Sequence, residues 1–407
     1  MATAYDVHRD HGVLWLEDAP DFPGSVLPER CDTVVAGAGL AGVRLALELR
    51  RAGRDVLLLE ADTAGSGATG RSGGQLLARL PWPYATAVKH LGRETARSWR
   101  GLLELNHTWL DHELEGCRSG VQYMRTGSLA CAADNTERLL LEHSARLLVE
   151  DGFEAEFWTA DQMLKRLGAG PFAGALHQPE DGTLHPARLV WTLLQHYLDL
   201  GGAYRHHCPV TGATSGADGC TVTAGDRVIH CNQVAWCVER ELGACLPEFS
   251  AVLPVASGRV LRTTRERKVL AMPMHSADGL HQWRQAERGE VLLCDLQPGD
   301  PGMAAESILT EPDSARLDTM LELSRNSIPK LSAAGVGGGW TTGWARTADG
   351  LPLAGPRPGH AGQFLLGGWQ GGGLGQAIVF GRLLAGEMTG GPADPRLEPF
   401  RPARLFQ

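Results

Sequence analysis

The sequence predicts an α/β protein with a parallel sheet covered on both faces, joined to a second, α+β domain that carries an antiparallel sheet. A strand, glycine turn, helix and strand follow one another over residues 32–60, and the last strand is a continuous apolar run typical of a buried parallel sheet. Alternating apolar stretches at 258–263 and 290–295 predict the half-exposed antiparallel sheet. The 407 residues leave room for two or three such domains.

The first strand, Thr33–Ala36, leads into the turn Gly37-Ala38-Gly39-Leu40-Ala41-Gly42, and the helix expected from Val43 to Arg51 ends at Gly53. The acidic residue Glu60 closes the next strand, 60 − 37 = 23 positions after the turn begins. A glycine turn in this context predicts a Rossmann-type dinucleotide site.

Each residue of that turn has an expected task. Gly37 permits the tight turn, Gly39 lets the backbone approach a pyrophosphate, and Gly42 allows the helix to pack closely on the strand. Glu60 would accept hydrogen bonds from an adenosine ribose, which suits NAD or FAD and disfavours NADP. A glycine turn in some other α/β fold is the alternative.

A second glycine-rich loop follows, and five of the eleven residues from Gly65 to Gln75 are glycine. A loop with so few side chains lets a flat or extended ligand lie against its backbone.

Further elements are expected in chain order. Amphipathic helices are expected between residues 82 and 180, and a further helix over 185–202. Strands are expected at 204–210, 220–224 and 227–238, a helix at 314–327, and an apolar helix from Leu374 after a glycine-dense stretch.

Composition excludes several classes of protein. With 38 basic and 47 acidic residues the net charge is −9, and no basic arm is present, so nucleic acid is a poor partner. The longest uncharged stretch, 361–381, is too rich in glycine and glutamine for a membrane span. No secretory signal is visible, and the nine cysteines are scattered without a metal-binding spacing. We therefore expect a cytoplasmic protein without a metal site.

Several separated motifs resemble the D-amino-acid oxidase superfamily of flavoproteins, in its branch with glycine oxidase, sarcosine oxidase and γ-glutamylputrescine oxidase. The motifs are the Gly65–Gln75 loop, His185-Pro186-Ala187-Arg188-Leu189, Trp340-Thr341-Thr342-Gly343, the stretch from Thr347 to Gly355, and the closing Asp394-Pro395 and Phe400–Arg404.

The resemblance implies an FAD cofactor. The histidine or cysteine through which some relatives attach FAD has no counterpart here, so non-covalent binding is expected. The resemblance places the helix after the last glycine loop at the flavin pyrimidine, where its positive end would stabilise the reduced ring. The expected FAD contacts are Gly37, Gly39, Leu40, Ala41, Gly42, Glu60, Ala61, Gly67, Ala68, Thr69, Gly70, Arg71, Ser72, Gly73, Gly74, Gln75, Val210, Gly343, Gly371, Gly372, Gly373 and Leu374.

The chain departs from the family at three places. Larger side chains, Val234–Arg240, replace a small turn at the expected cofactor wall, and Trp369 and Gly372 replace a histidine of the glycine loop. Trp344 stands where glycine oxidase-like members hold an arginine that pairs with the substrate carboxylate, and Arg346 follows two residues later.

The residues expected near the substrate are therefore Trp344, His281, Trp283 and Arg284, with Lys268 in the region of the oxygen-activating lysine of sarcosine oxidase-like relatives. For His281, Trp283 and Arg284 a packing role is an equal alternative.

The resemblance implies oxidation of an amine or amino acid to an imine, with a hydride passing to flavin N5 and oxygen reduced to hydrogen peroxide. A dehydrogenase or biosynthetic tailoring enzyme with another acceptor is the alternative, and a non-catalytic FAD-binding protein ranks below both. The substrate and the oligomeric state stay open.

The expected FAD-binding domain is discontinuous, 30–80, 185–250 and 340–407, with a substrate-binding domain of 81–184 and 251–339 and an N-terminal extension of 1–29. The reaction is expected where these domains meet.

Overall fold

The computed structural model describes residues 12–167, 170–296 and 314–406, and these residues form two compact units. The first unit holds the described residues up to Gly70, Pro186–Ala256, and those from Gly343 onward; the second holds Arg71–His185 and the described part of Ser257–Thr342. Residues 71–80 and 340–342, which the sequence grouped with the nucleotide-binding segments, cluster with the second unit. The assignment of FAD and substrate to the two units stays a prediction.

A parallel sheet forms the centre of the first unit and confirms the predicted fold class. β1 (Arg30–Ala36) lies between β2 (Val56–Leu59) and β11 (Arg227–Trp236), and both pairings are parallel. The sheet continues to β8 (Ala203–Arg205) beyond β2, and beyond β11 to β18 (Gln363–Gly367) and the antiparallel β17 (Leu353–Pro356). The carboxyl ends of β1 and β2 therefore lie side by side, which places Gly37 beside Glu60.

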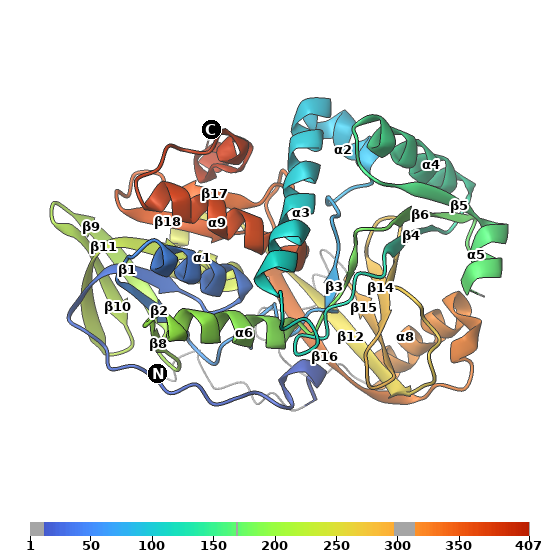
Figure 1. Cartoon of the computed structure of the whole chain (residues 1–407), viewed down its shortest axis with the longest axis horizontal. Helices are drawn as coiled ribbons and strands as arrows, with labels where there is room; N and C mark the ends of the chain where they lie inside the picture. The colour runs from blue at the N-terminus through green and yellow to red at the C-terminus, as the bar shows by residue number, and fades with distance from the viewer. Residues whose placement is uncertain (1–11, 168–169, 297–313, 407) are drawn as a thin grey trace. The chain divides into compact units, whose positions relative to one another are not determined.

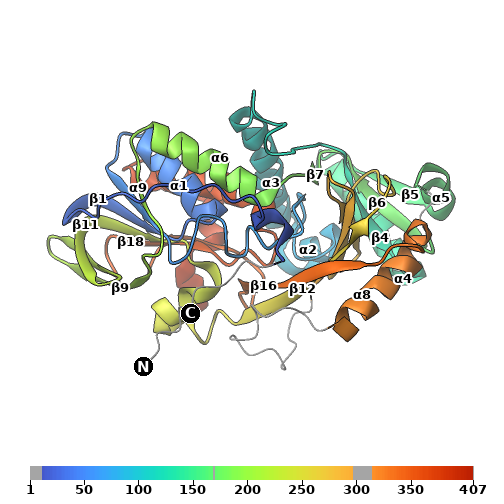
Figure 2. The same cartoon turned by 90° about the horizontal axis from the view of Figure 1, so that it is seen from below.

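Three helices pack together on one side of this sheet. α1 (Leu40–Arg51) contacts both α6 (Pro186–Asp199) and α9 (Ala377–Met388), as Figures 1 and 2 show. α1 ends at Arg51 with Ala52 as its C-cap, and Gly53 follows with a φ of +81°, the left-handed conformation expected of a glycine after a helix.

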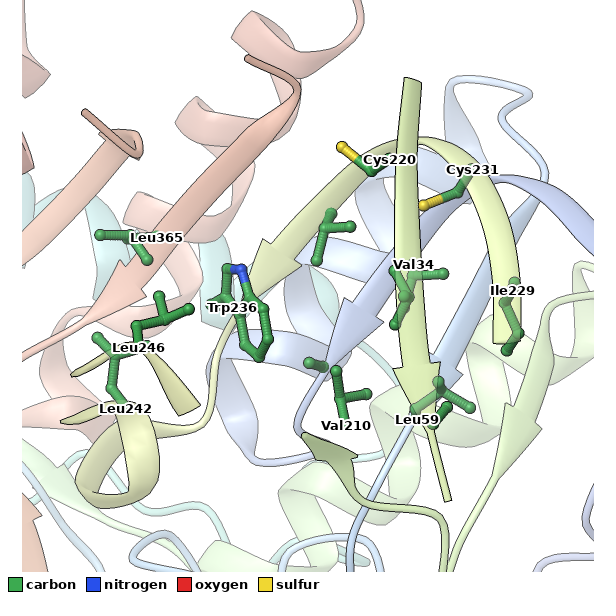
Figure 3. Close-up of a cluster of buried hydrophobic side chains, with 14 of the residues drawn as sticks. Val34, Leu59, Val210, Cys220, Ile229, Cys231, Trp236, Leu242, Leu246 and Leu365 are labelled. Carbon is green, nitrogen blue, oxygen red and sulfur yellow. The ribbon is translucent and has the colours of Figure 1, made fainter. Parts of the chain in front are cut away.

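An antiparallel meander covers the other face. β9 (Val210–Gly216) pairs with β10 (Gly219–Ala224), which pairs with β11. In the core between meander and sheet, the Trp236 ring lies with Leu242, Leu246 and Leu365 on one side and Val34 and Val210 on the other (Figure 3).

The strand expected over 204–210 is wrong as a single element. β8 ends at Arg205 and β9 begins at Val210, because His207 has a left-handed φ of +49° and Pro209 has no N–H to donate to a ladder.

The second unit contains the predicted antiparallel sheet. Its strand order is β16-β12-β15-β14-β13-β4-β6-β5, and β13 pairs with β4 in parallel. The strand bounds are β4 Ser128–Ala132, β5 Glu156–Thr159, β6 Gly174–Gln178, β12 Val255–Arg265, β13 Met274–Ser276, β14 His281–Gln285, β15 Glu290–Asp295 and β16 Val336–Ala345. The short strands β3 (Gln75–Leu76) and β7 (Gly182–Thr183) form a separate antiparallel pair.

Helices surround this sheet. They are α2 Tyr84–Leu91, α3 Arg93–Glu113, α4 Asn135–Glu150, α5 Ala160–Leu167 and α8 Ser314–Ser327, the last with the bounds predicted from the sequence. Buried side chains of α8 and α5 join those of β12, β14 and β15 in one core, which makes that face of the sheet apolar. Within the described ranges, no helix is both long enough and apolar enough to cross a bilayer.

Candidate functional site

The glycine turn after β1 has two positions that the protein's own packing reserves for glycine. Gly37 has a φ of +100°, and a Cβ there would lie 2.5 Å from the carbonyl oxygen of Cys237. A Cβ at Gly42 would lie 1.8 Å from the carbonyl oxygen of Gly37. Both distances are well inside van der Waals contact, so the tight turn and the close helix packing predicted for these residues are present.

Gly39 and Gly67 differ from these two because no described protein atom requires a glycine there. A Cβ at Gly39 would meet only the Thr69 hydroxyl, at 3.5 Å, and a Cβ at Gly67 would meet no described atom within 4 Å. Gly39 has ordinary backbone angles, φ −72° and ψ −179°. The open space in front of these glycines suits an extended ligand, and the residues present therefore fit the pyrophosphate end of FAD.

The N-terminus of α1 presents backbone N–H groups to that space. The N–H of Val43 makes the first bond within the helix, to Gly39 O at 3.0 Å, and Leu40 N–H donates to Thr69 Oγ1 at 3.3 Å. The N–H groups of Ala41 and Gly42 precede the first helical bond, as at any helix start. Gly65 N–H donates to Ala38 O at 3.0 Å and holds the second glycine loop beside this end. Such a helix end attracts an anion.

Glu60 lies beside the same turn. Its Oε2 accepts from the N–H of Ala38 at 2.6 Å, and its Oε1 accepts from the N–H of Asp62 at 3.0 Å. Burial raises the pKa of Glu60 to about 7, and nearby Asp62 and Glu241 add to the rise while the two N–H bonds oppose it. Each oxygen has a second lone pair, so the carboxylate can still accept from two ribose hydroxyls. Ala61, the next predicted contact, is exposed.

The predicted glycine loop divides between the two units after Gly70. In the first unit, Gly70 N–H donates to Gly65 O at 2.9 Å, and a Cβ at Gly70 would lie 2.2 Å from that oxygen, so this half is a closed turn that also carries Ala68. In the second unit, residues 71–75 bind to the sheet of that unit. Arg71 O accepts from the Trp340 indole N–H at 2.9 Å, and Ser72 Oγ accepts from Gly74 N–H at 3.3 Å.

Arg284 holds the second half of the glycine loop, residues 71–75, through a hydrogen bond to its backbone. Its side chain is 1% exposed, and Nη1 donates to Gly74 O at 2.8 Å and to Leu184 O at 2.6 Å. Gln75 Nε2 donates to Trp283 O at 3.0 Å, and a Cβ at Gly73 would lie 2.6 Å from Cys294 Sγ. These contacts hold residues 73–75 flat against β14 and β15. Two of the hydrogen bonds of the Arg284 guanidinium therefore go to backbone carbonyls of its own unit, which supports a packing role, and its substrate role stays a prediction.

Trp283 and His281 also have contacts that explain them within the second unit. Trp283 is buried in the apolar core of the sheet and meets Phe172 edge-on, with ring centroids 6.5 Å apart. His281 Nε2 lies 3.4 Å from Asp295 Oδ1. Burial would raise the pKa of Asp295, but hydrogen bonds from His281 and Arg316 outweigh it and lower that pKa. The packing alternative therefore has support for both, and their substrate role stays a prediction.

Lys268 lies in the connection between β12 and β13, and its side chain is exposed. Arg346, the other arginine considered for an acid group, is half-buried after β16, and its N–H donates to Pro254 O at 3.0 Å. The role of Lys268 in oxygen activation therefore stays a prediction.

The C-terminal glycine loop joins β18 to α9 in the first unit. Gly371 has a φ of +78°, and a Cβ there would lie 3.6 Å from Nε1 of Trp344. Trp344 is 7% exposed and follows Gly343 on β16, so its indole faces the loop in which the resemblance places the flavin ring. Gly372 and Gly373 allow the close approach of Gln376 and Trp369, because a Cβ would lie 3.0 Å and 3.3 Å from those side chains.

The expected helix start near Leu374 is wrong by three residues. Residues Gly373–Gly375 form a 3₁₀ turn, and α9 begins at Ala377 after Gln376, whose φ of −135° is not helical. Glycines at 371–373 disfavour helix formation because they lose the most backbone entropy on ordering. The N-terminus of α9 still follows the glycine loop within two residues of Gly375.

Glu239 contacts the C-terminal glycine loop, and the sequence did not single it out as a site residue. It belongs to the 3₁₀ turn Glu239–Glu241 after β11, has a φ of +38°, and its Oε2 accepts from Gly368 N–H at 3.1 Å. Its Oε1 accepts from Trp369 N–H at 3.4 Å. Burial raises the pKa of Glu239 to about 7. The only sequence signal was the departure from a small turn at Val234–Arg240.

Val210, predicted to meet the adenine through its backbone, is the first residue of β9 and is buried. Its carbonyl oxygen accepts from the Cys245 thiol at an S···O distance of 3.6 Å. A thiol is a weak donor, so this carbonyl remains a good acceptor for a stronger donor group.

A protein-family model described as FAD dependent oxidoreductase matches residues 32–387. The probable oxidoreductase OrdL of Haemophilus influenzae is 30% identical over 193 residues, 46% of this chain and 44% of that protein. The γ-glutamylputrescine oxidoreductase of Escherichia coli is 29% identical over 161 residues, 39% of this chain and 38% of that protein. The matched segments span less than half the length of these two relatives.

Among solved structures, glycine oxidase from Geobacillus kaustophilus superposes with a TM-score of 0.79 and 19% sequence identity, over 92% of this chain and 98% of that one. This likeness extends to nearly the whole chain and concerns the fold.

Proposed function

The chain belongs to the family of FAD-dependent oxidoreductases, and on that premise we propose that it oxidises a C–N bond of a small-molecule amine, with FAD bound non-covalently and oxygen as acceptor. The observation that carries the proposal is the open turn at Gly39 beside the Glu60 carboxylate, in a Rossmann-type unit whose C-terminal glycine loop lies against Trp344 of β16. The E. coli relative is named as an oxidoreductase of γ-glutamylputrescine, which supports an amine as the substrate class.

The chain's own groups would hold the cofactor at three places. The N-terminus of α1, with Gly39, Leu40 and Ala41, would bind the pyrophosphate through backbone N–H groups. Glu60 would accept from the adenosine ribose, and the loop at Gly371 would meet the ring. Bound FAD supplies the two-electron oxidation, and the protein contributes binding, orientation and electrostatics.

Trp344 sets the expected substrate preference. An amino-acid carboxylate that leaves water needs a charged partner, because an unpaired buried charge costs several kcal/mol. The indole next to Gly371 offers an apolar face and, for a protonated amine, a cation–π contact instead. An amine or N-substituted amine therefore suits this face better than a simple D-amino acid.

The second candidate function is the same oxidation with an electron acceptor other than oxygen, and the position of Lys268 favours it. This lysine was the counterpart considered for oxygen activation, yet its side chain is exposed in a surface connection of the second unit. A dehydrogenase would carry out the same oxidation of the substrate and pass the electrons to a quinone or a protein.

The test has two stages. Purified protein, yellow with bound FAD, is mixed anaerobically with sarcosine, glycine, D-alanine, alkylamines and acylated polyamines, and loss of the flavin absorbance at its visible maximum is followed. Bleaching by an amine supports the proposed class, and no bleaching by any member of the panel contradicts it. Air is then admitted, and one peroxide formed per substrate oxidised assigns an oxidase, whereas slow reoxidation that a quinone accelerates assigns a dehydrogenase.

A further inference from the structure

We propose that Glu239 is a positioning residue that fixes the C-terminal glycine loop, Gly367–Gly375, against the cofactor-binding side of the first unit. The inference rests on the proposed FAD site and adds to it a residue that the family's small turn does not supply.

The carboxylate of Glu239 uses both of its oxygens on this loop. Oε2 accepts from Gly368 N–H at 3.1 Å and Oε1 from Trp369 N–H at 3.4 Å. A Cβ at Gly367 would lie 3.0 Å from Oε2, so the loop can approach the carboxylate closely because a glycine precedes the two donors. Two adjacent N–H groups on two oxygens of one carboxylate define the loop's position in two directions.

The backbone of Glu239 supports the same role. Its φ of +38° lies in the left-handed region, which a residue with a side chain adopts only when surrounding contacts hold it there. The hydrogen bonds from Gly368 and Trp369 are such contacts, together with an additional backbone donor at Ala345, next to Trp344.

The turn that bears Glu239 also touches the dinucleotide turn. A Cβ at Gly37 would lie 2.5 Å from Cys237 O and 3.3 Å from Cγ1 of Val238, the residue before Glu239. The segment Cys237–Glu239 therefore connects the glycine turn expected at the pyrophosphate, through Cys237 and Val238, with the glycine loop expected at the flavin ring, through Glu239. Both belong to the first unit. A displacement of the glycine turn at Gly37 would therefore move the C-terminal glycine loop as well, because both pack against this segment.

The charges around Glu239 determine how pH acts on this contact. Glu241 on the same turn is ion-paired to Arg240 and repels Glu239, the Cys237 thiol lies on the strand side, and Arg346 follows Ala345 on β16. The loop residues 367–369 carry no charge. With a pKa raised to about 7 by burial, Glu239 gains its full charge as the pH rises above neutrality, and its hydrogen bonds to the loop become charge-assisted.

The substitution Glu239→Gln tests the role with little change in volume. It replaces one acceptor oxygen by an NH₂ group, which faces an N–H donor and cannot accept from it. The matched control is Glu241→Gln, on the same turn but paired to Arg240 and not to the loop.

The readouts are the FAD dissociation constant, the absorption spectrum of the bound flavin, and the dissociation constant of sulfite, each from about pH 6 to about pH 8. We expect E239Q to release FAD about tenfold more readily, the equivalent of one lost hydrogen bond to a charged group, and to shift the flavin spectrum. Part of the pH dependence of wild-type sulfite binding should disappear in E239Q and persist in E241Q.

Equal FAD affinity, spectrum and pH dependence in E239Q, E241Q and the wild type would overturn the inference. If E239Q does not fold, Glu239→Asp replaces it, since the shorter carboxylate keeps the charge but withdraws from the loop, and the same outcomes apply. A wild-type protein that takes up no FAD at all would instead remove the proposed function, which separates the two failures.

Discussion

The backbone N–H of Ala38 donates to the carboxylate of Glu60 at 2.6 Å, so the glycine turn after β1 and the acidic end of β2 form one unit of structure. This bond lies within the first unit, between neighbouring parallel strands that pair from Thr33 and Val56 onward. The turn therefore orients the carboxylate before any ligand arrives, which lowers the ordering cost of binding.

Replacing Glu60 by Gln is expected to weaken FAD binding without unfolding the chain. The amide loses the charge that the ribose hydroxyls would bond to, and a hydrogen bond to a charged group contributes about 1.5–3 kcal/mol, which corresponds to roughly 10- to 150-fold in dissociation constant. Fluorescence titration of the apoprotein with FAD measures this dissociation constant. Asp62→Asn is the control, since Asp62 contacts Glu60 through its backbone N–H. An unchanged dissociation constant in E60Q would remove Glu60 from the site.

Gly39→Ala and Gly42→Ala form a matched pair in which only the second should harm the empty protein. At Gly39 the new methyl group would meet Thr69 Oγ1 at 3.5 Å, an ordinary contact, whereas at Gly42 it would lie 1.8 Å from Gly37 O. We expect G39A to keep its melting temperature to within a few degrees and to lose FAD affinity, because the methyl group occupies the ligand's space. G42A should lose stability by several kcal/mol.

Thermal or urea unfolding of both apoproteins, followed by FAD titration, distinguishes the two effects. Normal FAD affinity in G39A would mean that the ligand does not approach that backbone.

The stability of the apoprotein should fall as the pH rises from about 4.5 to about 7. Glu60 and Glu239 keep their protons in the folded protein up to a pKa of about 7, whereas in the unfolded chain their pKa is the ordinary 4.5. Between these values the folded state binds more protons, so raising the pH favours the unfolded state. Urea unfolding at several pH values measures the slope, and the double variant Glu60→Gln with Glu239→Gln should show a smaller one. A slope that the double variant leaves unchanged would place the linkage elsewhere.

The fold was predictable because its signals are local. The helix 314–327 and the segment from Thr33 to Glu60 are apolar patterns of fixed period, each bounded by turn residues. The helix start at Ala377 was not predictable, because Gly373, Leu374 and Gly375 form a 3₁₀ turn. The geometry of that turn depends on Trp369 and Gln376, which pack against the glycines.

The candidate site was predictable in part. The residues of a local motif could be predicted, and the residues that act through contacts distant in the sequence could not. Glycines and Glu60 act through a motif whose spacing is visible in the chain. Arg284 and Glu239 act on backbone groups 210 and about 130 positions away, and no periodicity encodes such a contact. From sequence, an arginine in a polar strand is equally consistent with a substrate ligand and with a structural hydrogen-bond donor. The structure favours the structural role because Arg284 donates to the carbonyl groups of Gly74 and Leu184.

Arg284→Met should therefore destabilise the second unit. Removing the guanidinium leaves the carbonyl of Leu184 without that donor, while Gly74 O keeps its bond from Leu184 N–H at 3.0 Å, and an unsatisfied buried group costs about 1–3 kcal/mol. We expect a lower melting temperature and faster proteolysis in residues 71–80, with kcat and KM changing together across all substrates. A KM that rises only for substrates with an acid group, at unchanged stability, would instead identify Arg284 as a substrate contact.

The last prediction concerns substrate class and depends on Trp344, whose indole lies beside Gly371. If this face takes the carbon chain or the ammonium group of an amine, Trp344→Ala should lower kcat/KM for alkyl and acylated amines by about 10- to 100-fold, since a buried aromatic contact contributes about 1.5–3 kcal/mol. Trp344→Phe keeps an aromatic face and should keep most of the activity, which separates loss of the contact from loss of folding. The measurement is anaerobic flavin reduction and steady-state turnover with D-alanine, glycine, sarcosine and the amine set. Fast wild-type turnover of D-alanine or glycine at micromolar KM would contradict the prediction, and it would mean that an arginine outside the contacts described here pairs with the carboxylate.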